Sequence, residues 1–404
     1  MKAVMYGGGN IGRGFIGVLF SESGYDTTFI DVAVPVVDGL NSAHKYPVRI
    51  ISSEGFEDVD VLNVSAVNGN DVDAVATAIA EADVMATAVG VNILKFIIPN
   101  LVAGIRKRIE LGGKPLNVLI CENLMDANKV LEKMLKDNLN EDECKWLDEN
   151  LGLVEASIGR MVPVQTDEMK DGDPLRVCVE RYGFLPVDKA AFKGEIPNIK
   201  NMVPFEPFDF YIKRKLYIHN MGHATCAYLG DLLGLEYIYQ SIDNNDVLII
   251  VKNAMQESAS VLSMHYGVKL EDVLKHIDDL LLRFTNSALK DTCKRVGGDP
   301  KRKLSPADRL IGSSLLALQQ GVTPAYIAIG AAAAVVRYIN EAEGLTQSTE
   351  TALKVLNEVS LLGKDAALTK LILTNYEFII QGKSLNEIRK FASLQKVKSY
   401  GKVI

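Results

Sequence analysis

Residues 3–12 read AVMYGGGNIG, an apolar run that passes into a cluster of glycines. The apolar run predicts a β-strand, and residues 11–23 after it carry apolar side chains at helical spacing. A turn between a strand and a helix with the spacing G-x-G-x-x-G binds dinucleotides. Its first glycine allows a tight turn, its second lets the backbone approach a pyrophosphate, and its third lets helix and strand pack closely. The stretch therefore predicts the start of a Rossmann-type domain, with its glycines at Gly7, Gly9 and Gly12.

An acidic residue stands near the end of the second predicted strand, Thr27–Val32. Asp31 follows Gly12 by about 20 residues, the distance at which this fold places a carboxylate beside the ribose. A carboxylate there accepts from the ribose 2′-OH and repels a 2′-phosphate, so NAD is favoured over NADP. The other residues of the turn are expected to complete the cofactor site, with the arginine near the phosphates: Asn10, Ile11 and Arg13.

Helices and strands alternate through the rest of the first part, with helices predicted at 74–82 and 93–111 and strands at 83–89 and 116–121. This alternation predicts an α/β domain with a parallel sheet and helices on both faces. Later strands of this fold end over the same crevice. The turns that follow two of these strands are therefore candidate parts of the cofactor site or the active site. Plain loops after buried strands are the alternative. The candidate residues are Thr87 and Val89 in the first turn, and Glu122 and Asn123 in the second.

The 404 residues predict two domains, since single cores rarely exceed roughly 200 residues. Prolines recur between 186 and 207, after a strand-like run at 175–182, which places the boundary near residue 195. We therefore expect an NAD-binding domain over 1–195 and a substrate domain over 196–404. Helical periodicity dominates the second domain, which predicts a mostly all-α fold, and the apolar run 324–336 is typical of a buried, Ala-rich helix.

The composition narrows the class of protein. A net charge of −7 is unfavourable for sequence-independent nucleic-acid binding, which depends on Lys and Arg. The five cysteines form no C-x-x-C pair, so neither a zinc site nor a disulfide framework is expected. We see no signal peptide and no apolar run of the roughly 20 residues that a membrane span needs. These features predict a cytoplasmic protein that binds a small molecule, and they leave the oligomeric state open.

Residues 213–223 read KRKLYIHNMGH, and on an α-helix three polar side chains there share one side. Asn220 lies about 140° and His223 about 80° around the axis from Lys215. Hydride transfer from an alcohol needs a base for the hydroxyl proton, and a desolvated lysine is suited to that role. An asparagine amide can hold the developing alkoxide, and a histidine can orient the substrate. The alternative is a solvated basic face with one packed histidine.

Several motifs, in this order and spacing, resemble those of the polyol-specific long-chain dehydrogenases, from Met1 to about Ile339. They are GGGNIGRGFIG (7–17), CEN (121–123), FKGEIPNI (192–199), K-x-x-x-x-N-x-x-H (215–223), RFTNSALKD (283–291) and RVGGDPKRKLSPADRLIG (295–312). The resemblance implies that Lys215 is the general acid/base, that Asn220 and Asn123 hold the oxyanion, and that His223 contacts substrate hydroxyls. It also implies NAD as the cofactor, no metal, and interconversion of mannitol 1-phosphate and fructose 6-phosphate.

Basic residues gather between 295 and 309 in this acidic chain, and they are candidates for holding a substrate phosphate. A solvated loop, or pairing with Asp299 and Asp308, is the alternative. The chain also departs from the family at Gly159, where an aspartate is usual, so its substrate is less defined than its reaction. A hexuronate reductase acting on tagaturonate or fructuronate, or an NAD-binding regulator without catalysis, remains an alternative function. The candidate substrate-binding residues are Arg295, Arg302, Lys303 and Arg309.

Overall fold

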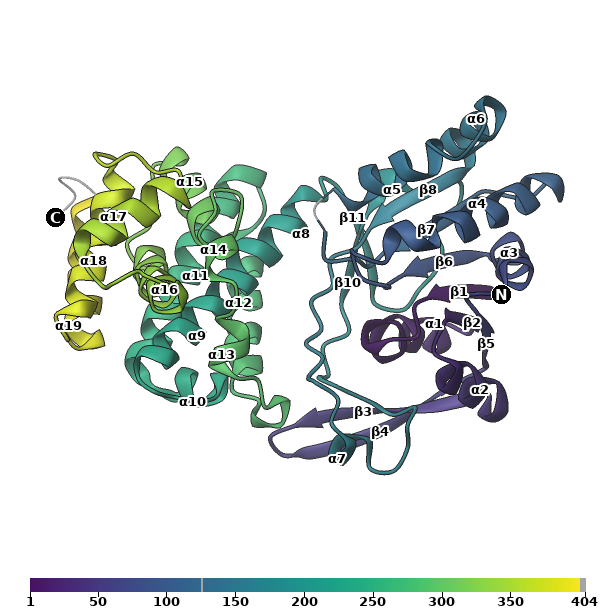
Figure 1. Cartoon of the computed structure of the whole chain (residues 1–404), viewed down its shortest axis with the longest axis horizontal. Helices are drawn as coiled ribbons and strands as arrows, with labels where there is room; N and C mark the ends of the chain where they lie inside the picture. The colour runs from purple at the N-terminus through teal and green to yellow at the C-terminus, as the bar shows by residue number, and fades with distance from the viewer. Residues whose placement is uncertain (125, 400–404) are drawn as a thin grey trace. The chain divides into compact units, whose positions relative to one another are not determined.

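The computed structural model describes residues 1–124 and 126–399, and it divides into two compact units, Met1–Asp209 and Phe210–Ile404 (Figure 1). The boundary predicted near residue 195 is therefore too early. The reason is a parallel strand pair that the proline-containing segment completes, because β11 (Met202–Phe205) lies beside β10 (Leu185–Asp188) in the first unit. Pro204 is tolerated in this two-stranded pair because an edge strand does not need every N–H donor.

The first unit is built on a six-stranded, fully parallel sheet in the order β5-β2-β1-β6-β7-β8. The parallel sheet predicted from the alternating pattern is confirmed, as are the four predicted strands on which the glycine turn and the two later turns depend. The two outermost strands, β5 and β8, had not been predicted. The strands span Lys2–Tyr6 (β1), Asp26–Asp31 (β2), Val64–Asn68 (β5), Val84–Thr87 (β6), Leu116–Ile120 (β7) and Leu151–Glu155 (β8).

Helices cover both faces of this sheet, and β1 shows how one strand serves both. Ala3 and Met5 belong to one buried cluster, and Val4 and Tyr6 belong to the other, as the two-residue period of a strand requires. The first cluster includes the glycine-turn helix and α2, and the second includes α3 to α6. The helices span Gly12–Ile16 (η1, a π-helical turn), Gly17–Glu22 (α1), Val34–Ala43 (α2), Val72–Glu81 (α3), Leu94–Glu110 (α4), Ala127–Lys136 (α5) and Glu141–Asn150 (α6).

A small second sheet belongs to the same unit and had not been predicted. Strands β3 (Lys45–Ser52) and β4 (Gly55–Leu62) form an antiparallel hairpin, and β9 (Val177–Val179) pairs in parallel with β3. The strand-like run at 175–182 is thus a short strand that joins this hairpin rather than the main sheet. Two short helical turns complete the unit, α7 (Asp167–Lys170) and η2 (Lys189–Ala191).

The second unit is helical, and no strand occurs among its described residues, which confirms the predicted mostly all-α domain. The apolar run predicted to be a buried helix forms α16, in which Ala331, Ala332 and Ala334 are fully buried. The helices span Asp209–Arg214 (α8), Lys215–Asn220 (η3), Met221–Leu232 (α9), Ile238–Asp243 (α10), Asn245–Tyr266 (α11), Leu270–Phe284 (α12), Ser287–Leu289 (η4), Cys293–Val296 (α13), Pro300–Lys303 (α14), Ile311–Gln319 (α15), Ile327–Glu341 (α16), Thr349–Glu358 (α17), Ala367–Ile380 (α18) and Leu385–Ser399 (α19).

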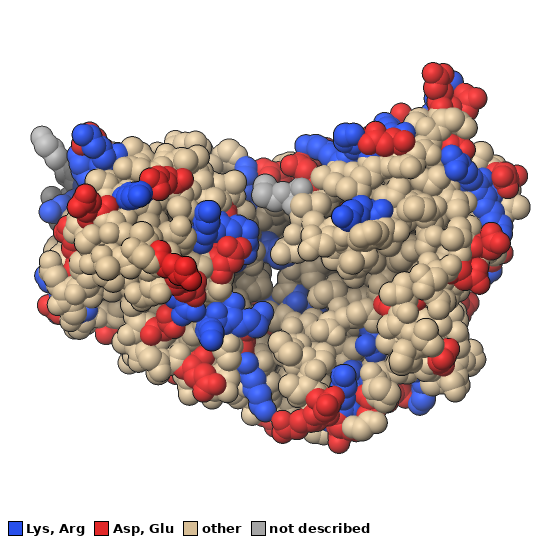
Figure 2. Space-filling model, viewed as in Figure 1, with Lys and Arg blue, Asp and Glu red and all other residues tan. Residues whose placement is uncertain are grey.

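Helix α16 supports α9 at close range. A Cβ on Gly330 of α16 would lie 2.3 Å from Oγ1 of Thr225 in α9, so only glycine permits this approach. Within the part of the chain that the structure describes, no helix is both long and apolar enough to cross a membrane. On the visible face in Figure 2, basic and acidic side chains lie beside one another over much of the surface. The chain contains such close pairs, for example that between Lys136 and Asp148 at 2.6 Å.

A buried carboxylate from α11 closes the N-terminus of α16. Glu257 is 2% exposed, and its oxygens accept from the backbone N–H of Tyr326 at 3.0 and 3.1 Å and of Ile327 at 3.1 Å. Burial raises the pKa of Glu257 to about 8, although these hydrogen bonds act in the opposite direction. The folded chain therefore holds a proton here that the unfolded chain releases near pH 4.5.

This difference predicts a pH-dependent stability that Glu257→Gln removes. Between pH 4.5 and about 8 the folded chain binds more protons than the unfolded chain, so the free energy of unfolding falls as the pH rises. Glutamine keeps a carbonyl acceptor and cannot ionise. We compare the free energies of unfolding in urea of Glu257→Gln and the wild type. We expect the difference to shift in favour of the variant by on the order of 3 kcal/mol between about pH 5 and pH 8. Identical pH dependence in both proteins would contradict this assignment.

Candidate active site

Each glycine of the turn after β1 has the geometry that a dinucleotide turn needs. Gly7 has φ +103°, in the region that favours glycine, and a Cβ there would lie 2.6 Å from the carbonyl oxygen of Ala88. A Cβ on Gly12 would lie 1.9 Å from the carbonyl oxygen of Gly7. A Cβ on Gly9, by contrast, would meet nothing within 4 Å. The open side of the turn is therefore at Gly9, where a pyrophosphate needs room.

The carboxylate of Asp31 is tied to the same turn. Its Oδ2 accepts from the backbone N–H of Gly8 at 2.7 Å, and its Oδ1 accepts from Ala33 N–H at 2.9 Å. Each oxygen of an ionised carboxylate has a second lone pair, so Asp31 keeps capacity to accept from a ribose hydroxyl. The half-buried side chain thus fixes the turn and presents an acceptor at the end of β2. Both features fit NAD.

Arg13 also has a role that was not predicted. Its side chain is buried, with Nε donating to the carbonyl oxygen of Gly8 at 2.6 Å and Nη1 donating to that of Leu175. These bonds stabilise the turn from its buried side, and a position of the guanidinium near the cofactor phosphates stays a prediction. Ile11 likewise packs partly against the core, whereas Asn10 is exposed.

The turns after β6 and β7 are joined by a carboxylate. Glu122 is buried, and its two oxygens accept from Val89 N–H at 2.9 Å and Gly90 N–H at 2.8 Å. Glu122 therefore shapes the first turn from the second. Thr87 is fully buried, so the predicted cofactor contact by its side chain is not supported. Asn123 is exposed in the turn after β7.

The Lys–Asn pair of the second unit lies on a π-helical turn, η3 (Lys215–Asn220), and His223 follows in α9. The prediction that these side chains share one side assumed α-helical spacing, in which Asn220 lies about 140° around the axis from Lys215. A π-turn links residues five apart by hydrogen bonds, so it brings these two residues closer to one side of the helix. Such turns are frequent at functional sites. The apolar periodicity of the sequence did not reveal this π-helical turn.

The ring of His223 is held by two neighbours in its own unit. It stacks on Phe284 with ring centres 4.8 Å apart and planes 16° apart. Its Nε2 lies 3.2 Å from Oδ2 of Asp291, and both side chains are largely buried. Asp291 is the last residue of the 283–291 motif, but the sequence predicted no role for it. Its signal was a carboxylate in a run that matched the family, and only the fold brings it to His223.

The pKa of Asp291 reflects these contacts. Burial alone would raise the pKa of this carboxyl, but the contacts with His223 and Arg295 outweigh burial and lower it. The buried ring of His219 lies beside Phe284 as well, with centres 6.0 Å apart, and burial followed by the positive charge of Arg283 lowers its pKa well below the ordinary value. Asp291 is therefore a charged carboxylate, and the buried histidine of this region that is kept neutral is His219.

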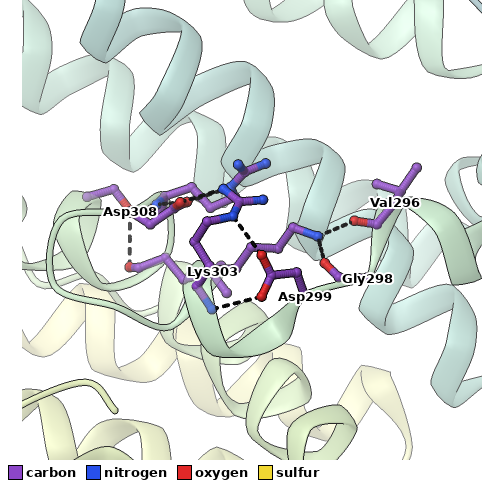
Figure 3. A network of polar contacts seen from close by, with 9 residues as sticks. Val296, Gly298, Asp299, Lys303 and Asp308 are labelled. Atoms are coloured by element: carbon purple, nitrogen blue, oxygen red, sulfur yellow. Dashed lines mark hydrogen bonds and ion pairs between the residues drawn. The ribbon is translucent and has the colours of Figure 1, made fainter. Parts of the chain in front are cut away.

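The basic segment at 295–309 forms ion pairs of the kind that the alternative interpretation proposed (Figure 3). Arg302 contacts Asp299 and Asp308, each at 2.8 Å, and Arg309 contacts Asp308 at 2.7 Å. Arg295 pairs in the same way with Asp291. The arginine charges are therefore matched within the chain. Arg295 and Arg302 still have side chains that are more than half exposed, at 57% and 51%.

Lys303 points into the protein rather than to a ligand. It is 4% exposed, and its Nζ donates to the carbonyl oxygens of Val296 (2.6 Å) and Gly298, as Figure 3 shows. Burial, followed by the positive charges of Arg309 and Arg302, lowers its pKa to about 8. Direct substrate binding by Lys303 is not supported, because this side chain anchors the loop before α14.

At Gly159, where the resemblance led us to expect an aspartate, the structure places an aromatic ring. A Cβ on Gly159 would lie 2.9 Å from Cε1 of Tyr182, so this packing requires glycine. Among the described residues, no group of three or more His, Cys, Asp and Glu side chains has the arrangement of a metal site.

A parallel sheet with this glycine turn and acidic strand end, followed by a helical unit with a Lys–Asn–His set, defines a dinucleotide-dependent dehydrogenase. The family model described as the mannitol dehydrogenase Rossmann domain matches residues 1–201, and the mannitol dehydrogenase C-terminal domain matches residues 208–388. The chain belongs to the mannitol dehydrogenase family. The match continues past Ile339, so the resemblance extends further than the sequence motifs indicated.

Individual relatives agree with this family. Mannitol-1-phosphate 5-dehydrogenase of Brevibacillus brevis is 38% identical over 334 residues, which cover 83% of this chain and 85% of that protein. Two solved structures share the fold: a D-sorbitol dehydrogenase in substrate-free form (TM-score 0.81, 15% identity, covering 96% of this chain and 94% of that one) and Pseudomonas fluorescens mannitol 2-dehydrogenase with NAD and D-mannitol (TM-score 0.73, 13% identity, 98% and 94%). As a member of this family the chain is a polyol dehydrogenase, and its glycine turn and Asp31 fit NAD as the cofactor.

Proposed function

We propose that this enzyme interconverts mannitol 1-phosphate and fructose 6-phosphate with NAD. The observation that carries the proposal is the 38% identity, over 83% of the chain, to a mannitol-1-phosphate 5-dehydrogenase. The π-turn that brings Lys215 and Asn220 toward one side of their helix supports the same chemistry. A cytoplasmic location is part of the proposal, and it is supported by the five cysteines, because no disulfide joins them among the described residues.

The glycine turn and Asp31 would hold NADH, which would supply the hydride for the carbonyl carbon of the keto sugar in the direction of reduction. The negative charge then develops on the carbonyl oxygen. The ammonium group of Lys215 gives its proton to that oxygen, and in the reverse direction the neutral amine takes the proton from the hydroxyl. Asn220 donates an amide N–H to the oxygen as charge develops, and the same role is proposed for Asn123. His223 would bind a neighbouring hydroxyl of the substrate. No step in this scheme needs a metal.

The phosphate would be met by arginines whose partners leave part of the guanidinium accessible. Arg295 and Arg302 are the exposed arginines of the basic segment. Arg295 already has one aspartate partner, and Arg302 has two. An arginine has five N–H donors, so a phosphate can bind beside an existing carboxylate. We assign the phosphate to these two residues and leave Arg309, whose side chain is largely buried, as support for the loop.

A panel of keto sugars tests the proposal. NADH oxidation is followed with fructose 6-phosphate, free fructose, tagaturonate and fructuronate as substrates. We expect kcat/KM for fructose 6-phosphate to exceed that for fructose about 10²-fold, because two charge-assisted hydrogen bonds are lost with the phosphate. Turnover of the uronates alone would replace the proposal with a hexuronate reductase. NADH binding without turnover of any of these sugars would favour a regulator.

A further inference from the structure

Asp291 is fixed in place by more than its contact with His223. Its Oδ1 accepts from Nε of Arg295 at 2.8 Å, while Oδ2 faces the histidine. The backbone on both sides is also anchored, because the carbonyl oxygen of Asp291 accepts from Ile238 N–H at 2.9 Å and Cys293 N–H donates to the carbonyl oxygen of Glu236 at 2.8 Å. These contacts therefore hold the carboxylate of Asp291 in a fixed position beside the imidazole of His223.

Two constraints of different kind act on the His223 ring. Stacking on Phe284 fixes the plane of the ring but still permits a half-turn flip about the Cβ–Cγ bond, which leaves the ring in the same plane. The carboxylate of Asp291 favours one of these two orientations, because its Oδ2 lies 3.2 Å from Nε2 and a flipped ring would present a C–H there instead. A neutral imidazole carries its proton on only one nitrogen, and an ionised carboxylate can only accept. The carboxylate therefore favours the form with the proton on Nε2, which leaves Nδ1 as an acceptor.

We propose that Asp291 is a positioning residue that sets the orientation and the protonated nitrogen of His223, so that Nδ1 can accept a hydrogen bond from a hydroxyl of the polyol. The inference rests on the proposed role of His223 in binding substrate hydroxyls. It also gives Arg295 a second task, because the same carboxylate links this guanidinium to the histidine. Asp291 need not touch the substrate to act in this way.

Nitrogen NMR of the full chain, labelled with [15N]histidine, reads the protonated nitrogen without any assay of activity. The spectrum has five histidines, and loss of one resonance set in His223→Gln assigns His223. At about pH 8, where an ordinary histidine is neutral, we expect the proton on Nε2. A proton on Nδ1 would overturn the inference, even if the enzyme turns over the proposed substrate. Conversely, the Nε2 form with no polyol turnover would leave Asp291 in place and defeat the proposed function.

Asp291→Asn tests the consequence for substrate binding. In asparagine one of the two oxygen positions, which face Arg295 and His223 respectively, becomes an NH2 donor, so the side chain cannot accept at both positions. We expect KM for fructose 6-phosphate to rise about tenfold, with a smaller change in kcat and an unchanged Kd for NADH. In the His223→Gln background the same substitution should raise KM by a smaller factor than in the wild type, because the part of its effect that passes through the histidine is lost. Fully additive effects of the two substitutions would show a merely structural role and overturn the inference.

A matched control comes from the same helix as His223. Asp231 pairs with Arg337 at 2.8 Å and has no contact with a histidine among the described interactions. Asp231→Asn therefore removes an aspartate–arginine pair without touching the ring, and KM should stay within twofold of the wild type. If Asp231→Asn raised KM as Asp291→Asn does, the effect would belong to helix stability and the positioning role would be lost. Should Asp291→Asn fail to fold, the wild-type spectrum alone still decides the protonated nitrogen.

Discussion

Replacing Lys215 with alanine is expected to lower kcat for fructose 6-phosphate reduction by about 10³-fold or more, while the Kd for NADH stays within twofold of the wild type. The loss is large because Lys215 is the only group in the proposed scheme that moves the hydroxyl proton. NADH binding is preserved because the glycine turn and Asp31 belong to the first unit. Steady-state kinetics and NADH fluorescence titration measure the two quantities separately.

The choice of control decides what that loss means. Lys215→Arg keeps a positive charge but cannot release a proton near neutral pH, so it should be nearly as inactive as Lys215→Ala. Lys252→Ala removes a half-exposed lysine of α11 that pairs with Asp278 at 3.1 Å, and it should leave kcat unchanged. Residual kcat within threefold of the wild type in Lys215→Ala would remove the lysine from the chemistry.

Gly12→Ala is expected to raise the Kd for NADH about 10²-fold and to lower the free energy of unfolding. A Cβ at this position would lie 1.9 Å from the carbonyl oxygen of Gly7, a backbone atom, so the turn itself must move. A shift of this kind disturbs the N–H groups that are expected to face the pyrophosphate. Fluorescence titration gives the Kd, and urea unfolding gives the stability.

Gly9→Ala separates these two effects. A Cβ on Gly9 meets no protein atom within 4 Å, so the unfolding free energy should match that of the wild type. The methyl group would nevertheless stand on the open side of the turn, and NADH binding should weaken. If Gly9→Ala bound NADH as tightly as the wild type, the pyrophosphate would not approach the turn at Gly9, and the cofactor placement would be wrong.

The features that sequence reasoning predicted are local ones. About 30 consecutive residues contain the glycine turn, the strands around it and Asp31. Over so short a stretch, the period and spacing of residues indicate the structure directly. The buried helix α16 was equally readable from its run of small apolar residues. The hairpin of β3 and β4 was missed although its strands are eight residues each, because its outer strand is mostly exposed and shows little apolar alternation.

What the sequence could not predict depends on contacts between distant residues. Arg13 appeared free to meet a phosphate, but its partner Leu175 lies far along the chain. Asp291 and His223 are likewise separated along the chain by helices α10, α11 and α12, and no periodicity joins them. The π-turn at Lys215 was hidden for a different reason, because one extra residue in a helical turn leaves the apolar pattern almost unchanged. In each case the residue type indicated a functional role, but the sequence did not indicate which residue it would contact.

The most direct test of the central claim is the oxidation of mannitol 1-phosphate by NAD in the presence of a metal chelator. We predict formation of NADH together with an equal amount of fructose 6-phosphate, identified by NMR, at a rate that the chelator does not change. Free mannitol at the same concentration should react at least tenfold more slowly. Failure to form NADH from mannitol 1-phosphate, or activity that disappears with the chelator and returns with added zinc, would contradict the account.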